Sequence, residues 1–188
     1  MVDYLDYLKI TSPDDLTDNI VKKIESMIRN SKEYRGYLSF IKEHLSIRNC
    51  AFFEQIDFVE KKLSIEFHHL ITLYNLVTIV GCKMLTELKD NEYLLTFDIA
   101  KAVIEEHIND NIPGVMLSET VHELVHSGLY QIPSNSKEVH LGNYEKFIRK
   151  YSVFLTDNDI TTIKYFLPPE KQMEVDELWQ EVNYQKST

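Results

Sequence analysis

Apolar residues recur at every third or fourth position along most of the chain, which is the spacing of an amphipathic helix. The first stripe follows Ser12-Pro13, a typical helix start, and runs to about Asn30. Similar patterns predict a polar C-terminal helix after Pro168-Pro169 and helices at 31–45, 70–88, 96–109, 118–127, 142–151 and 156–167. Packing against a common core is the simplest explanation of these stripes.

Three short segments have the character of strands. In residues 63–69, apolar and polar side chains alternate, as expected for a half-buried strand. Residues 50–53 and 115–117 are brief apolar runs of strand type. Because helical positions far outnumber these, the sequence predicts a mainly helical α+β fold.

The composition is that of a globular protein without a membrane span. Of the 188 residues, 44% are hydrophobic, and no apolar run is long enough to cross a bilayer. The start of the chain, Met-Val-Asp-Tyr-Leu-Asp, is acidic and lacks the pattern of a signal peptide. The two cysteines, Cys50 and Cys82, are too few for a disulfide framework. We therefore expect a cytoplasmic protein with no membrane partner.

The net charge of −10 and the isoelectric point near 5.1 weigh against nucleic acid as a partner. Affinity for phosphate comes from Lys and Arg side chains, which acidic residues outnumber in this chain. The charge is unevenly distributed, however. Residues 134–151 carry four basic side chains against two acidic ones, whereas acidic residues dominate 152–188. A basic strip is therefore available beside the helix predicted at 118–127.

Two histidines of that helix are placed to share a metal ion. His122 and His126 are four positions apart, so on a helix their imidazoles project from one face. Imidazole nitrogen is a common ligand of Zn²⁺ and similar ions. Ser118 is a suitable N-cap and Gly128 a suitable stop, which would hold both histidines in one short helix.

A second histidine pair, His68-His69, stands at the end of the strand predicted at 63–69. Adjacent residues of a strand point to its opposite faces. One of the two could therefore bind a metal while the other faces a substrate. A pair of strands that supplies His68-His69, followed by a helix that supplies His122 and His126, would bring three or four imidazoles together.

These residues resemble a known nuclease pattern. The segment Ile65-Glu66-Phe67-His68-His69, followed later by the segment from Val115 to Gly128, is similar to the HNH (ββα-metal) endonucleases. That family has an apolar strand ending in His-His, a second short strand, and a helix with His-x-x-x-His before a Gly. In ligand type the chain is most similar to the nuclease colicins, which have two histidines on the helix and no cysteine.

The resemblance implies metal-dependent hydrolysis of phosphodiesters, with DNA as the expected substrate. His68, His122 and His126 would hold one divalent ion, whose identity among Zn, Mg, Mn and Ni stays open. His69 would be the general base that deprotonates the attacking water. Asn111 is the first choice for the Asn that orients this base in the family, and Asn109 and Asn75 are weaker choices. Weaker candidates for contacts with neighbouring phosphates are His140, Lys146, Arg149 and Lys150.

The two halves of the pattern are unusually far apart, with 52 residues between His69 and His122. Most of these residues look helical, so we expect a ββα-metal core over 49–142 that contains a helical insertion at 70–112. Helical regions at 1–48 and 143–188 would surround this core in one compact unit. A small, acidic protein of this kind would suit a phage or mobile element. It would act within a larger protein assembly and, if viral, in the host cytoplasm.

Two other functions stay open from the sequence. His122-Glu-Leu-Val-His126 also matches the His-Glu-x-x-His motif of zinc metallopeptidases, in which the glutamate, here Glu123, activates water. That interpretation leaves His68-His69 without a role, and its third ligand is undecided between Glu138 and Glu145. The other alternative is a structural or interaction protein whose histidines are hydrogen-bonded and bind no metal.

Overall fold

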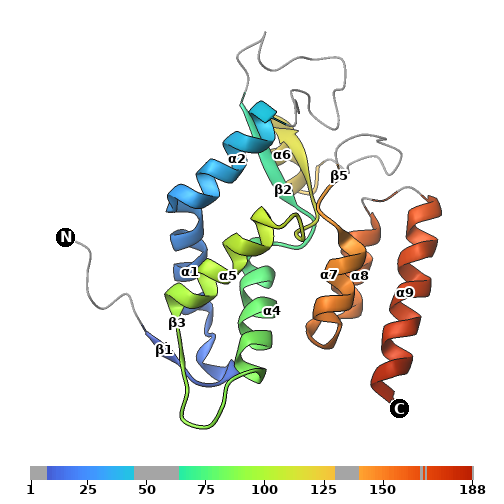
Figure 1. The fold of residues 1–188 in the computed structure, drawn as a ribbon. Coiled ribbons are helices and arrows are strands. Elements are labelled where there is room, and N and C mark those ends of the chain that lie inside the picture. Colours follow the sequence, from blue (N-terminus) through green and yellow to red (C-terminus); the bar gives the residue numbers. More distant parts are fainter. Residues whose placement is uncertain (1–7, 45–63, 130–139, 166, 168, 188) are drawn as a thin grey trace. The chain divides into compact units, whose positions relative to one another are not determined.

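In the computed structural model the chain is a mainly helical α+β protein, as the sequence predicts (Figure 1). The structure describes residues 8–44, 64–129, 140–165, 167 and 169–187. The strand predicted at 50–53 lies outside these residues. The chain divides into two compact units, Met1–Tyr37 with Thr72–Asn109 and Leu38–Ile71 with Asp110–Thr188.

Unit 1 is built from three helices that pack on one another: α1 (Asp18–Asn30), α4 (Leu73–Thr86) and α5 (Thr96–Ile108). The first part of α2 (Lys32–His44) also belongs to this unit. Fully buried apolar side chains from each of the three helices form its core, among them Val21, Ile24, Leu76, Val77, Ile99 and Val103. These are positions of the apolar stripes, so helical periodicity and tertiary packing agree here.

The start of the first helix differs from the prediction. Ser12 and Pro13 lead into a short 3-10 turn, η2 (Pro13–Asp15), and α1 begins only at Asp18. The Asp15 carboxylate accepts hydrogen bonds from the backbone N–H groups of Thr11 and Ser12, at 2.7 and 3.0 Å. These hydrogen bonds cap the 3-10 turn and not α1. Thr17, which has an extended backbone, separates the turn from α1.

Two strands of unit 1 were not predicted. β1 (Lys9–Ile10) pairs antiparallel with β3 (Leu94–Leu95), which immediately precedes α5. Each strand is two residues long, too short for any alternation to be visible in the sequence. The pair ties the beginning of the described chain to the N-terminus of α5.

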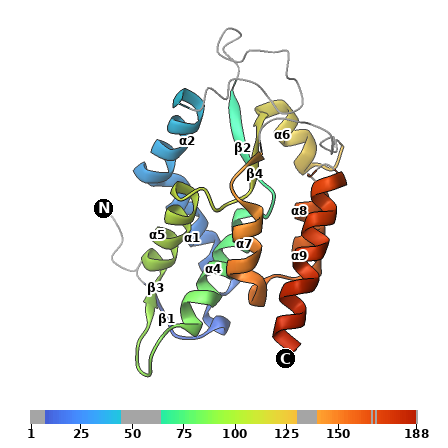
Figure 2. The same cartoon turned by 45° about the vertical axis from the view of Figure 1, so that its right-hand side comes forward.

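Unit 2 contains a three-stranded antiparallel sheet in the order β2-β4-β5. β2 (Ile65–His69) pairs with β4 (Gly114–Ser118) over its whole length, so that His68 faces Val115 and His69 faces Gly114. β5 (His140–Leu141), which was not predicted, adds to the other edge of β4. Helix α6 (Glu119–His126) follows β4 directly and packs against β2 and β4 (Figure 2).

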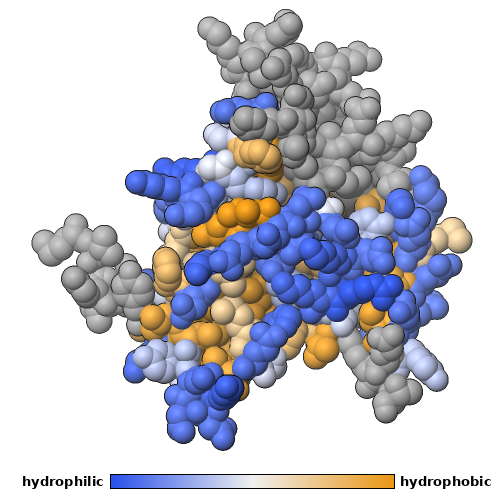
Figure 3. Space-filling view, viewed as in Figure 1, coloured by the Kyte–Doolittle hydropathy of each residue, from blue (hydrophilic) through white to orange (hydrophobic). Residues whose placement is uncertain are grey.

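The rest of unit 2 is helical. It comprises α7 (Tyr144–Tyr151), the 3-10 turn η3 (Ser152–Phe154), α8 (Asp157–Tyr165) and α9 (Pro169–Ser187). Helix α9 packs against α7, η3 and α8, and buries Val175 while most of its other side chains are polar. No described helix combines the length and the apolar composition that crossing a bilayer requires. On the face shown in Figure 3, hydrophilic side chains alternate with patches of apolar ones.

The two units group the chain differently from the predicted ranges 1–48, 49–142 and 143–188. Helices α4 and α5, which occupy the expected insertion at 70–112, pack with α1 and form unit 1. The sheet, α6 and the C-terminal helices form unit 2. Helices α4 and α5 belong to unit 1 because their apolar faces are buried against α1.

Candidate metal centre

Helix α6 is short because both of its ends are specified by local hydrogen bonds. The Ser118 hydroxyl accepts a hydrogen bond from the backbone N–H of Val121 at the N-terminus. At the C-terminus Gly128 has a φ of 72°, and its N–H donates to the Val125 carbonyl. The N–H of Leu129 donates to the Leu124 carbonyl, which completes a Schellman motif. The predicted N-cap and the predicted glycine stop are both confirmed.

Three histidines from β2 and α6 come together in unit 2. Each of His68, His122 and His126 offers one ring nitrogen, and these three atoms lie within 4.8 Å of one another. The Nε2 atoms of His122 and His126 are 3.0 Å apart. The ring centroids of His68 are 5.2 Å from His122 and 5.1 Å from His126. The fold therefore gathers residues that are far apart in the sequence.

Glu66 orients one of these rings. Its Oε2 atom accepts a hydrogen bond from Nδ1 of His122 over 2.6 Å. A carboxylate has no proton to donate at neutral pH, so the His122 proton resides on Nδ1 and the Nε2 lone pair faces the other histidines. A carboxylate that fixes the tautomer of a histidine in this way is the usual outer-shell partner of a metal ligand.

Glu66 was not identified from the sequence. It is two residues from His68 on β2, so both side chains lie on the strand face that packs against α6. This alternation was visible in the sequence, because residues 65–69 follow the strand pattern. What the sequence did not provide was the position of His122, the partner that gives Glu66 its role.

The three histidines differ in burial. His68 is 7% exposed, His122 is partly buried and His126 is exposed. Burial, with a smaller contribution from His122 and His126, lowers the pKa of His68 to about 4. His68 is therefore neutral at pH 7, the form in which imidazole binds a metal. The exposed His126 places one side of the cluster next to solvent.

The dimensions of the cluster fit a single metal ion. Three imidazole nitrogens at about 2.0–2.1 Å from a tetrahedral ion are roughly 3.3 Å apart. The separation of 3.0 Å between the Nε2 atoms of His122 and His126 is close to that value. The ligand atom of His68 lies within 4.8 Å of each of these, so small side-chain adjustments would bring it to the same spacing. His68, His122 and His126 would hold the ion, and three protein ligands leave a position for water or substrate.

His69 and Asn111 stand apart from the three-histidine cluster. The His69 ring packs edge-on against Phe67, at 4.8 Å between centroids. Phe67 and His69 share the strand face opposite to that of Glu66 and His68. Asn111 is buried and precedes β4 at the end of the sheet where His69 pairs with Gly114. Both residues therefore lie near the same end of the β2-β4 pair, but neither belongs to the group of ligand atoms.

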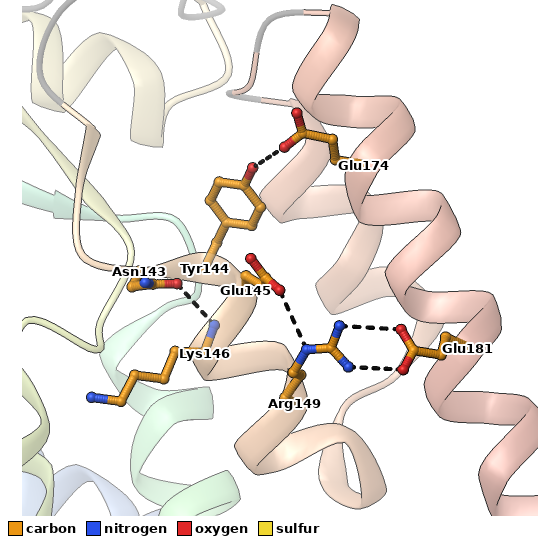
Figure 4. A network of polar contacts seen from close by, with 7 residues as sticks. All are labelled: Asn143, Tyr144, Glu145, Lys146, Arg149, Glu174 and Glu181. Atoms are coloured by element: carbon orange, nitrogen blue, oxygen red, sulfur yellow. Dashed lines mark hydrogen bonds and ion pairs between the residues drawn. The ribbon is translucent and has the colours of Figure 1, made fainter.

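The residues predicted to contact phosphate are on β5 and α7. His140 pairs through its backbone with Val115. The Arg149 guanidinium forms a bidentate ion pair with Glu181, at 3.0 and 3.1 Å, and a longer contact with Glu145 (Figure 4). Two carboxylates therefore surround this one cation, which lowers the positive charge that it offers to a phosphate.

The two lysines of α7 are in different surroundings. The backbone N–H of Lys146 donates to the side chain of Asn143, the N-cap of α7, and the Lys146 side chain extends away from the Arg149 network (Figure 4). The Lys150 ammonium lies 5.4 Å from the ring centre of Tyr151. Their proposed contacts with phosphate stay predictions.

These features define the class of the protein as a mainly helical α+β protein with a three-histidine cluster on one strand and one helix. Comparison with known families then identifies its relatives. The model of the bacteriophage G278-like virion protein family matches residues 3–186. The chain belongs to this family. Searches of curated proteins and of solved structures found no match.

Membership of this family agrees with the phage-like character predicted from the sequence. A virion protein is part of a larger assembly, which also agrees with the partner predicted at that level. The particle, rather than the predicted cytoplasm, is the location that the family description indicates. Nuclease activity, the bound metal and DNA as a partner stay predictions.

Proposed function

We propose that this chain is a metal-dependent phosphodiesterase of the phage particle, with DNA as its substrate. The observation that carries the proposal is the convergence of His68, His122 and His126 from a strand and a helix, within 4.8 Å at their ligand atoms. β2 and α6 supply the three histidines, and β4 lies between these two elements in the chain. Strand, strand and helix is the order that the resemblance to HNH endonucleases implies.

The donor set favours a transition metal. Three imidazole nitrogens suit zinc or nickel better than manganese or magnesium, which prefer oxygen ligands. A bound ion would supply Lewis-acid chemistry at the scissile phosphate. The chain's own contributions are the tautomer fixed by Glu66 on His122 and the buried, neutral His68, with His126 on the side that faces solvent.

The base that deprotonates the attacking water is proposed to be His69, on the resemblance alone. Strand alternation directs its ring away from the face of His68 and towards Phe67. A role in proton transfer therefore requires the water to be reached from the end of the strand, where Asn111 is also found. This part of the proposal is tested separately from metal binding.

A zinc peptidase would use the same helix differently, with Glu123 as its base. Glu123 is exposed and does not belong to the group of ligand atoms formed by His68, His122 and His126. His68 also supplies the third ligand that the peptidase interpretation lacked. The cluster itself would serve either enzyme, because the glutamate of a zinc peptidase is a base and not a metal ligand. The succession of β2, β4 and α6, which corresponds to the HNH pattern, is what favours the phosphodiesterase.

The acidic charge of the chain limits where such an enzyme would act. A net charge of −10 disfavours capture of duplex DNA from dilute solution. An enzyme held inside a particle would meet its substrate at high local concentration, because both are confined there. Membership of a virion protein family supports this setting.

The experiment has two steps, metal content and cleavage. We expect mass spectrometry of the purified protein to show one bound equivalent of zinc or nickel, and His122→Ala to lose this metal. With metal bound, plasmid DNA should be nicked. His69→Ala should keep the metal and lose nicking, whereas Glu123→Gln, on the exposed side of the same helix, should retain both.

Each step has a result that contradicts it. If the protein binds one equivalent of metal but cleaves neither plasmid, single-stranded DNA nor RNA, the site is a structural metal site and the proposed nuclease activity is wrong. Normal nicking by His69→Ala would show that His69 is not the base, and would leave the rest of the proposal unaffected. Loss of peptide cleavage in Glu123→Gln, with no nicking by any variant, would establish the peptidase instead.

A further inference from the structure

Unit 1 carries an apolar groove that the proposed reaction does not use. It has a volume of about 500 Å³ and is formed by α1, the start of α2 and α5. Met27 of α1 and Phe97, Ala100, Ile104 and Ile108 of α5 provide its apolar lining. The α5 residues are spaced by three or four positions, so they form one stripe along the helix.

The two ends of this stripe are open to solvent. Phe97 is 50% exposed and Ile108 is 56% exposed, whereas Ala100 and Ile104 between them are buried. Apolar surface shows between hydrophilic side chains in the region of α1 and α5 (Figure 3). Large apolar side chains at both ends of a groove are typical of a surface that receives a helix from a partner.

Charges of opposite sign lie beside the middle of the stripe. Lys101 and Glu105 line the groove and form an ion pair along α5, at 3.7 Å, with side chains 64% and 56% exposed. Because both are so exposed, the pair itself contributes little to stability. The order of the two charges along the helix matters more for docking. If a second α5 runs antiparallel to the first, the lysine of each helix faces the glutamate of the other.

We propose that a second copy of this chain docks in the groove, with the two α5 helices antiparallel about a two-fold axis. Such an axis, passing midway between positions 101 and 105, brings Lys101 opposite Glu105 of the partner subunit. By symmetry the reciprocal pair forms as well. At a rise of about 1.5 Å per residue, Phe97 then lies beside Ile108 of the partner subunit.

This occupant accounts for both features of the groove. The exposed apolar ends cover each other, and Lys101 and Glu105 each face a charge of opposite sign. Membership of a virion protein family supports contacts between copies, because a virion protein is part of a larger assembly. A contact of two three-turn helices belongs to the smaller class of interfaces, so its dimer should dissociate on dilution. The proposal is independent of the metal centre.

The first test removes an apolar end of the groove. We expect the full chain to dimerise with rising concentration in sedimentation equilibrium, and Phe97→Glu to abolish this. Val153→Glu, which changes a side chain 70% exposed in unit 2, is the matched control and should dimerise normally. Circular dichroism and thermal unfolding check that both variants fold. A wild-type chain that stays monomeric at every concentration would overturn the proposal.

The second test uses the symmetry of the charges. Lys101→Glu places acids at both 101 and 105, and Glu105→Lys places bases at both positions. Each variant alone should therefore dimerise about tenfold more weakly. A mixture of the two variants pairs acids with bases, and should dimerise at least as well as the wild type. Equal dimerisation of each single variant and the mixture would show that α5 does not face α5 of the partner subunit.

Discussion

The Glu66 carboxylate holds the His122 ring through a 2.6 Å hydrogen bond between residues 56 positions apart in the chain. This contact fixes which nitrogen of His122 is available to a metal, since the proton is kept on Nδ1. It links β2 to α6 at the point where the three histidines meet.

Replacing Glu66 should weaken metal binding without removing a ligand. Loss of an outer-shell carboxylate typically lowers metal affinity by about 10–100-fold. We expect Glu66→Ala to fall in this range, and Glu66→Gln to lose less because its amide oxygen still accepts a hydrogen bond. Competition with a chromogenic chelator measures the affinities. Glu119→Gln, at the exposed start of α6, is the control, and equal affinities in all four proteins would contradict the role of Glu66.

Metal should stabilise unit 2 and leave unit 1 unchanged. A ligand that binds only the folded state at one hundred times its dissociation constant stabilises it by about 2.7 kcal/mol. Hydrogen exchange with and without zinc should therefore slow in β2, β4 and α6. The amides of α1, α4 and α5 should exchange at the same rate in both conditions. His126→Ala should lose the effect, and uniform slowing across both units would indicate a different binding site.

Gly114 should be required for the packing of Phe67. A Cβ atom at position 114 would lie 2.1 Å from Cζ of Phe67, whose ring is buried. Because the ring would have to move, Gly114→Ala should cost about 1–3 kcal/mol in urea unfolding. Adding Phe67→Leu should recover part of that loss.

A glycine elsewhere provides the control for this substitution. A Cβ at Gly36, within α2, would meet no atom within 4 Å. Gly36→Ala should therefore stabilise the protein by about 0.5–1 kcal/mol, the usual gain in a helix. If both substitutions had the same effect, the contact between Gly114 and Phe67 would not be the cause.

Acid should destabilise unit 1 through His107. Burial lowers the pKa of His107 to about 4, and its Nδ1 donates to the Val103 carbonyl at 2.7 Å. An unfolded chain protonates histidine below about pH 6.5, whereas the folded chain resists protonation until about pH 4. Stability is therefore unaffected above pH 6.5 and falls by about 3 kcal/mol as the pH drops to 4.

The variant His107→Phe isolates this contribution. It keeps an aromatic ring against Tyr34, whose ring centroid is 5.1 Å from that of His107, but it cannot titrate. Urea unfolding at intervals from pH 7 to pH 4 should give a smaller loss of stability than in the wild type. Parallel curves for the two proteins would show that His107 is not responsible.

The helices and their ends are determined by local sequence. Apolar stripes with a helical period predict α1, α4 and α5, because a helix buries the same face at every turn. Ser118 and Gly128 specify the limits of α6, since a cap and a left-handed glycine satisfy backbone groups within a few residues. These interactions depend on neighbours in the chain, so the sequence alone is sufficient to predict them.

Tertiary structure decided which of these elements meet. The pairing of β2 with β4 brings His68 to α6 across the residues of α4 and α5, and only then does Glu66 reach His122. The same packing moves α4 and α5 into unit 1, and sets His69 on the other strand face from His68. Each apolar face could be buried against several other helices or strands, and the pattern within one segment does not specify which of them it packs against. The residue types of the site are therefore a property of the sequence, whereas their assembly belongs to the fold.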